Sequence, residues 1–175
     1  MRIDERFQIM QRQSFVCLAL LALTMACGAP GAASKAEAPK VIKMDGLEEI
    51  LSQKSTDLQV INFWATWCAP CIKELPYFEA LNASDRAVDV TLISLDFADE
   101  FEKKVIPFVE KRELKSRVVL LDEIDYNAWI DKVDPSWSGA IPATLIVNTQ
   151  NGKRKFVEKE LSEGELDAMV DEMLN

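Results

Sequence analysis

The sequence predicts a three-layer α/β domain with a central mixed β-sheet flanked by helices. Three short apolar runs rich in β-branched residues, at 58–64, 88–95 and 143–148, have the length and composition of buried strands. Segments in which apolar residues recur at helical spacing lie between these runs and after the last one. Strands that alternate with helices pair in parallel through right-handed crossovers, and such a sheet buries both faces under helices.

The first half of the domain begins with a short helix at 46–53, for which Asp45 is the expected cap. The strand at 58–64 (LQVINFW) leads into a helix at 69–82, and the strand at 88–95 leads into a helix at 99–111. Pro107 is expected to bend or interrupt this second helix, because proline lacks the N–H group that the helix requires. The apolar face of the helix at 69–82 consists of Ile72, Leu75, Phe78 and Leu81.

The second half contains a short strand at 118–121, a short helix at 124–133 and the strand at 143–148. A turn sequence at 150–152 (QNG) then predicts an antiparallel hairpin with a strand at 155–158. Ser162 is expected to cap the last helix, with Glu165 completing a capping box. The apolar face of that helix consists of Leu166, Met169, Val170 and Met173.

The composition excludes several classes of site. The 175 residues include four Cys and no His, and the formal net charge is -9. Without His there is no Ser-His-Asp triad, no Cys-His dyad and no His-containing zinc or haem site. The acidic balance argues against a nucleic-acid partner, because nucleic-acid phosphates bind basic surfaces.

The N-terminal residues have the features of an export signal followed by a tether. A polar segment with three Arg precedes an apolar run at 15–27, which is shorter than the roughly 20 residues of a membrane-spanning helix. We therefore expect a signal peptide at 1–26. Residues 27–39 are rich in Gly, Ala and Pro and are expected to form a flexible tether, which leaves 40–175 as the folded domain.

The apolar run ends in a small residue, Ala26, followed by Cys27, and this ending resembles a bacterial lipobox. This resemblance implies that Cys27 is lipidated and anchors the chain to a membrane. Cleavage by an ordinary signal peptidase near 31–33 is one alternative, and retention of 1–26 as an uncleaved anchor is another.

Cys68 and Cys71 remain in the domain, spaced C-x-x-C where the strand at 58–64 gives way to the helix at 69–82. Two thiolates are too few for a tetrahedral zinc site, although carboxylate or intermolecular ligands remain an alternative. A structural disulfide is the second alternative, but a bridge across so few residues constrains the unfolded chain little. The helix N-terminus favours a Cys68 thiolate. Cys68 is therefore expected to attack a partner disulfide, and Cys71 to resolve the mixed disulfide.

The WCAPC segment at 67–71 resembles the W-C-x-P-C signature of the thioredoxin superfamily. Pro76 matches the proline that kinks the active-site helix of this superfamily, and Ile141-Pro142 is similar to its cis-proline loop. The resemblance extends from about residue 41 to the C-terminus and implies a thioredoxin fold. It implies that Pro142 is cis and that its loop faces the dithiol and hydrogen-bonds an extended substrate.

Aromatic residues near the motif are candidates for an apolar docking rim. Trp67, Ile141 and Pro142 are the predicted substrate-binding residues, because Trp67 adjoins Cys68 and the other two form the cis-proline loop. Trp137, five residues before Pro142, is a further candidate, with burial in the core as the alternative.

The pattern C-x-P-C-x-x-E, preceded by NFW at 62–64, resembles the membrane-tethered TlpA/ResA group of this superfamily. The segment at 98–134 is similar to the central βα insertion of that group. The glutamate of the group tunes the cysteine pair, which implies that Glu74 shifts the thiol pKa or relays its proton. The alternative for Glu74 is a solvated position on the helix surface. Cytosolic thioredoxins carry a buried Asp where this chain has Asn62.

The predicted function is an extracytoplasmic thiol:disulfide oxidoreductase that reduces protein disulfides, as in cytochrome c maturation. We expect no cofactor beyond the Cys68–Cys71 disulfide, no metal, and a monomer on the periplasmic side of the cell envelope. The partners are disulfide-containing proteins and an upstream membrane protein that donates electrons. The reverse direction, as an oxidant or isomerase, and a non-catalytic lipoprotein module remain open. A peroxidase is disfavoured because Ala65 stands where such enzymes require Thr.

Overall fold

The computed structural model describes residues 37–55 and 57–175. The expected signal peptide at 1–26, Cys27 and most of the expected tether lie outside the described residues. Among the residues described, no helix has both the length and the apolar character that crossing a membrane requires.

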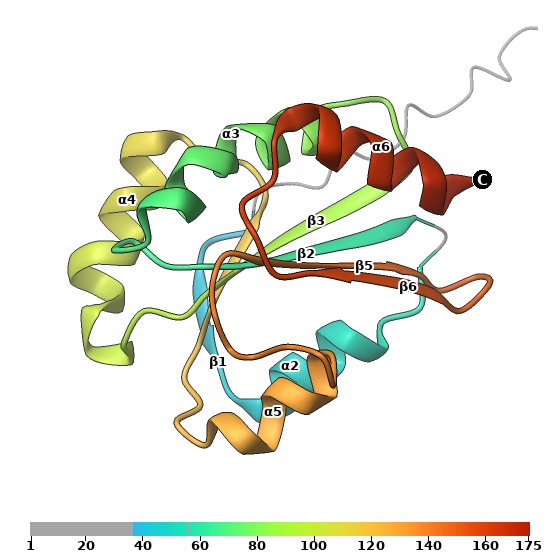
Figure 1. Cartoon of the computed structure of the whole chain (residues 1–175). Coiled ribbons are helices and arrows are strands. Elements are labelled where there is room, and N and C mark those ends of the chain that lie inside the picture. Colours follow the sequence, from blue (N-terminus) through green and yellow to red (C-terminus); the bar gives the residue numbers. More distant parts are fainter. Residues whose placement is uncertain (1–36, 56) are drawn as a thin grey trace, which may run out of the picture. The chain divides into compact units, whose positions relative to one another are not determined.

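The described residues build a six-stranded mixed sheet with strand order β1-β4-β3-β2-β5-β6 (Figure 1). The four strands from β1 to β2 in this order are parallel, and β5 and β6 join β2 as an antiparallel pair. In this order β2 is a central strand, with β3 on one side and β5 on the other. The cysteine motif follows β2 closely in the sequence. The strands are β1 (Lys40–Ile42), β2 (Leu58–Trp64), β3 (Val88–Ser94), β4 (Arg117–Leu121), β5 (Ala143–Asn148) and β6 (Lys153–Val157).

Helices cover both faces of the sheet (Figure 1). One face packs against α3 (Ala69–Asn82), α4 (Ile106–Arg112) and α6 (Glu163–Leu174). The other face packs against α2 (Met44–Ser52) and α5 (Tyr126–Val133). Every residue of β2 is buried, as a parallel strand covered on both faces must be. Its side chains alternate, so that Val60 and Trp64 join the α3 face.

Several predicted elements are confirmed. The bounds predicted for β2, α3 and β5 match those in the structure. Ser162 and Glu165 form the predicted capping box of α6, and the four predicted apolar residues of that helix are buried. Pro76 lies inside α3, which continues through it as one helix.

The start of the domain differs from the prediction. The sequence analysis missed β1, a three-residue edge strand that pairs in parallel with β4 and has two exposed residues. A strand this short, with so little burial, has no detectable period. Asp45 is not the cap of α2, because the helix begins at Met44 and its N-cap residue is Lys43, whose side chain makes no capping hydrogen bond. The Asp45 carboxylate instead accepts from the N–H group of Gly46 at 2.8 Å.

The segment predicted as a helix at 99–111 is divided into three parts. A 3₁₀ turn (Ala98–Glu100) and a π-helical turn (Phe101–Val105) precede α4, and the N–H group of Ile106 bonds the carbonyl of Phe101. Pro107 lies in the first turn of α4, where its missing N–H group is tolerated. The interruption therefore comes before the proline, as a widened turn rather than a bend at Pro107.

Smaller differences affect the ends of four other elements. One of them is β3, which ends at Ser94 rather than at residue 95. The α5 helix begins at Tyr126 rather than at residue 124, and β4 begins one residue earlier than predicted, at Arg117. The second hairpin strand is β6 (Lys153–Val157) rather than 155–158, because the turn at 150–152 brings Lys153 into register with Asn148.

Removing the α6 cap tests the stability attributed to it. Ser162→Ala is expected to lower the free energy of unfolding by about 1 kcal/mol, because the N–H group of Glu165 loses its acceptor. Ser162→Asn keeps a side-chain oxygen and is expected to preserve most of the stability. Urea unfolding followed by circular dichroism measures both variants. Equal losses in the two variants would contradict the capping role.

Candidate redox site

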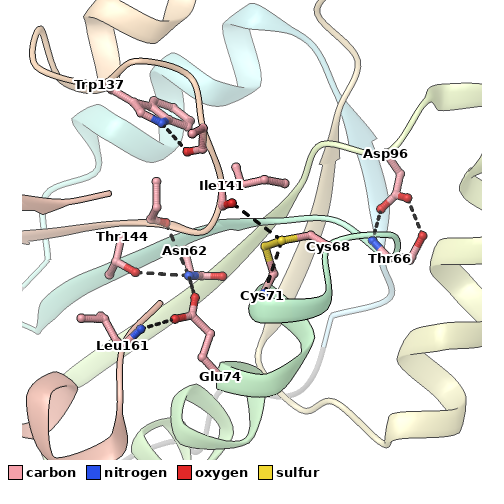
Figure 2. Close-up of a disulfide and its surroundings, with 12 residues drawn as sticks. Asn62, Thr66, Cys68, Cys71, Glu74, Asp96, Trp137, Ile141, Thr144 and Leu161 are labelled. Atoms are coloured by element: carbon pink, nitrogen blue, oxygen red, sulfur yellow. Dashed lines mark hydrogen bonds between the residues drawn. A yellow bond between two sulfur atoms is a disulfide. The ribbon is translucent and has the colours of Figure 1, made fainter. Parts of the chain in front are cut away.

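Cys68 and Cys71 form a disulfide at the N-terminus of α3, with an S–S distance of 2.00 Å (Figure 2). Cys68 is the N-cap residue, and its Sγ accepts from the N–H group of Cys71 at 3.3 Å. Pro70 lies within the first turn, where a missing N–H group costs no helical bond. The unpaired N–H groups and the positive end of the helix dipole therefore face the Cys68 sulfur and favour its thiolate.

The two cysteines differ in exposure. Cys68 is 5% exposed, whereas Cys71, in the first turn of α3, is fully buried. Trp67 stands beside Cys68 and is 62% exposed, so the motif presents an aromatic ring to solvent next to the reachable sulfur. A disulfide of another protein therefore meets Cys68 first.

The loop before β5 lies against the cysteine pair. The carbonyl oxygen of Ile141 is 3.8 Å from Cys68 Sγ, and the Ile141–Pro142 peptide bond is cis, as the family resemblance implies. Because β5 pairs with β2 in the sheet, the start of β5 comes beside the end of β2. The fold thus brings the motif residues Trp67, Cys68 and Cys71 together with Ile141 and Pro142. Ile141 lies 73 positions after Cys68 in the sequence.

Trp137 belongs to the core and not to a docking rim, which corrects the expectation for this residue. It is only 4% exposed, and its indole N–H group donates to the Ala140 carbonyl at 2.8 Å. Its ring packs against Phe63, Trp129 and Phe156. Trp137 therefore supports the loop that carries Pro142 from the inside.

Two carboxylates that the sequence analysis did not single out hold the loops of the site. The buried Asp96 accepts from the N–H and hydroxyl groups of Thr66, at 2.9 and 2.5 Å (Figure 2). It also accepts from the Ser94 hydroxyl. Glu158 accepts from the N–H and hydroxyl groups of Ser138 and from the N–H group of Ala140. These bonds, the Ser138 hydroxyl first, lower the pKa of Glu158. Asp96 fixes the chain before Cys68, and Glu158 fixes the chain before Pro142.

A positional signal for Asp96 exists in the sequence. Asp96 follows β3 closely, and Thr66 follows β2 closely. The carboxyl ends of adjacent parallel strands share one edge of the sheet, so the two residues had to meet there. No comparable local signal indicates Glu158.

Glu74 is fully buried, which excludes the solvated position that was its alternative. Its Oε1 accepts from Asn62 Nδ2 at 2.8 Å, and its Oε2 accepts from the N–H group of Leu161 at 2.7 Å. Burial raises the pKa of Glu74 to about 7, although both hydrogen bonds oppose the shift. One turn after Cys71, the chain therefore holds a carboxyl group that exchanges a proton near neutral pH.

Comparison with known proteins identifies relatives of this chain. Residues 34–169 match the family model described as Redoxin. The thiol-disulfide oxidoreductase ResA of Bacillus cereus is 36% identical over 104 residues, which are 59% of this chain and 54% of that protein. The chain therefore spans about half the length of this curated relative.

Solved structures show the same fold. A thioredoxin-related protein from Neisseria meningitidis serogroup B superposes with a TM-score of 0.58 at 24% identity, over 70% of this chain and 88% of that chain. A secreted Mycobacterium tuberculosis disulfide oxidoreductase, homologous to E. coli DsbE, gives a TM-score of 0.51 at 25% identity, over 67% and 83% of the two chains. With these matches and the disulfide at the start of α3, the chain belongs to the Redoxin family and is a TlpA/ResA-like member of the thioredoxin superfamily.

Proposed function

We propose that this protein is an extracytoplasmic thiol:disulfide oxidoreductase that reduces disulfides of other proteins through Cys68 and Cys71. The observation on which the proposal depends is the disulfide at the N-terminus of α3, in which Cys68 keeps 5% of its surface exposed and Cys71 keeps none. This arrangement separates an attacking sulfur from a resolving one. It supports exchange chemistry better than a structural bridge, because the bridge closes so short a loop.

In the reduced protein, the Cys68 thiolate attacks one sulfur of the substrate disulfide. A mixed disulfide forms, and the other substrate sulfur leaves as a thiolate that takes up a proton. Cys71 then loses its proton and attacks Cys68 Sγ, which releases the second substrate sulfur and forms the Cys68–Cys71 disulfide. Two electrons pass from the dithiol to the substrate, and no bound cofactor takes part.

Substrate binding is assigned to the surface around Cys68. Trp67 offers an exposed ring beside the sulfur, and the Ile141 carbonyl lies 3.8 Å from it. An extended substrate segment along the loop of Ile141 and Pro142 would place its disulfide over Cys68. The loop is held before substrate arrives by hydrogen bonds from Ala140 to Glu158 and from Trp137 to Ala140.

Glu74 is assigned as the group that tunes Cys71. The deprotonation of Cys71 needs a base, and the chain has no His to supply one. A carboxyl group with a pKa of about 7 is half ionised at neutral pH, which suits it to accept a proton and return it.

The N-terminal sequence and the relatives support the site of action and the partners included in this proposal. A signal peptide at 1–26 and a lipid on Cys27 would anchor the domain at the periplasmic side of the envelope, and the Mycobacterium tuberculosis relative is described as secreted. There the oxidised protein requires a membrane protein with a reduced dithiol to return two electrons. The substrates are protein disulfides, such as those formed in cytochrome c maturation, and the protein acts as a monomer.

The cysteine roles are tested by reduction of insulin disulfides. Cys68→Ser is expected to abolish the activity, whereas Cys71→Ser is expected to retain the first step and accumulate a mixed disulfide through Cys68. Cys27→Ser is the matched control and should leave the activity intact. Insulin turbidity and non-reducing electrophoresis measure these outcomes. Full activity of the Cys68→Ser variant would exclude the mechanism.

The direction of electron flow is tested by the reduction potential of the cysteine pair. A reductant is expected to lie near about -270 mV, and a strong oxidant near about -120 mV. Equilibration with glutathione or dithiothreitol buffers measures the potential. A value at the oxidant end would replace reduction with oxidation as the function.

The buried carboxyl group makes a prediction for stability. The pKa of Glu74 is raised from 4.5 to about 7, so between these pH values the folded state binds a proton that the unfolded state has lost. Stability should therefore fall as pH rises through this window, by about 3 kcal/mol relative to Glu74→Gln. Urea unfolding of the oxidised proteins from pH 4 to pH 8 measures the difference. Parallel pH profiles for the two proteins would contradict the raised pKa.

A further inference from the structure

The side chain of Asn62 is fully buried and only half of it is hydrogen-bonded. Its Nδ2 donates to Glu74 Oε1 at 2.8 Å, to Thr144 Oγ1 at 3.2 Å and to the Ala143 carbonyl at 3.4 Å. Its Oδ1 is shielded from solvent and has no hydrogen-bond partner. A buried amide oxygen without a donor is unfavourable, because it has lost its hydrogen bonds to water and gained none.

The orientation of this amide is fixed by its partners. The Ala143 carbonyl can only accept, and an ionised Glu74 can only accept, so the NH₂ group must face them. If the amide were flipped, its oxygen would face the Glu74 carboxylate and the Ala143 carbonyl, and neither of these can donate a hydrogen bond. The unpartnered Oδ1 therefore points away from Glu74, on the opposite side of the amide.

That opposite side faces the cysteine pair. Asn62 lies on the α3 face of β2, between Val60 and Trp64, and both neighbours share one core cluster with Cys68 and Cys71. Figure 2 shows the amide oxygen of Asn62 on the side toward the disulfide and the amide nitrogen on the side toward Glu74. In the disulfide neither sulfur carries a proton, so no donor is available to Oδ1.

We propose that the Asn62 amide oxygen accepts a hydrogen bond from the Cys71 thiol when the disulfide is reduced. Reduction by a dithiol breaks the S–S bond and adds two electrons to the pair. Of the two protons that the dithiol releases, Cys71 takes up one and the other goes to solvent, because Cys68 stays a thiolate. Cys71 thereby gains the S–H donor that Oδ1 lacks. Asn62 then bridges the resolving cysteine and Glu74 through opposite ends of one amide. Because Cys71 is the resolving cysteine, this role rests on the proposed function.

The proposed hydrogen bond between Asn62 and Cys71 affects the order in which the two cysteines react. A hydrogen bond to the neutral thiol favours the protonated form, so Cys71 stays a thiol while the helix N-terminus holds Cys68 as a thiolate. Only Cys68 is then ready to attack a substrate. Cys71 must break its bond to Asn62 and lose its proton before it can resolve the mixed disulfide.

Other charged groups also act on Cys71. Glu74 lies one turn along the same helix, and Cys68 is a thiolate in the reduced protein. Glu160, from the segment before α6, contributes to the raised pKa of Glu74 and pairs with Lys73. Ionised Glu74 raises the pKa of a neighbouring thiol, so a test must separate its charge from the Asn62 hydrogen bond.

The test measures the pKa of the Cys71 thiol in the full chain with Cys68→Ser, from the pH dependence of the Cys71 ¹³Cβ chemical shift. Asn62→Leu is expected to lower this pKa by about one unit, since a net hydrogen bond of about 1 kcal/mol is lost from the thiol. The shift should persist when Glu74→Gln is present in both proteins. Thr144→Val is the matched control, because it removes a partner of Nδ2 and leaves Oδ1 in place, and it should not shift the pKa.

An unchanged pKa in Asn62→Leu, or a shift that disappears with Glu74→Gln, would overturn the proposal. If Asn62→Leu does not fold, a crystal structure of the reduced, unsubstituted protein tests the same hydrogen bond directly. It should show Cys71 Sγ within hydrogen-bond distance of Asn62 Oδ1, and a thiol turned away would also overturn the proposal. Both measurements omit substrate, so failure of the proposed function would appear separately, in the insulin assay.

Discussion

The arrangement of the site depends on the two hydrogen bonds that the buried carboxyl group of Glu74 accepts. This carboxyl group projects from α3 and joins β2, through Asn62, to the segment before α6, through the N–H group of Leu161. A carboxyl group at this depth is tolerated because both oxygens are hydrogen-bonded, and it remains costly enough that its pKa rises to about 7. The helix that presents the cysteines is therefore fixed to the sheet by a group that also titrates.

Two other carboxylates accept hydrogen bonds from the backbone of the loops on either side of the disulfide. Asp96 receives the backbone N–H group of Thr66, and Glu158 receives those of Ser138 and Ala140. Each carboxylate comes from the end of a strand and fixes a loop that has no regular structure of its own. The N–H groups at the start of α3 have no such carboxylate and face the cysteine sulfur instead. The acidic side chains thus rigidify the site without placing an anion where the thiolate must form.

Prediction from sequence succeeded where the signal was local. The bounds of β2, α3 and β5 followed from continuous apolar runs and helical spacing, and the cysteine motif and Ile141-Pro142 followed from short patterns. The edge strand β1 and the π-helical turn were missed, since one is too short to show a period and the other depends on how α4 packs. The burial of Glu74 was also missed. The apolar residues of α3 indicate which face meets the sheet, but the hydrogen-bond partners that let a glutamate lie there, Asn62 and Leu161, come from distant segments. Trp137 shows the same limit, as only tertiary packing decides between core and rim.

The absence of His gives the raised pKa of Glu74 its importance. In most proteins imidazole is the side chain that titrates near neutral pH without perturbation, and this chain has none. Burial brings the carboxyl group of Glu74 into the same range. Glu74 lies one turn after Cys71, whose thiol loses a proton once per turnover in the proposed mechanism. If Asn62 bridges the two, the proton on Cys71 and the charge on Glu74 are coupled, and they titrate as a pair. The protonation state of the buried pair would then set when Cys71 becomes a nucleophile, while Cys68, the more accessible of the two cysteines, stays a thiolate throughout.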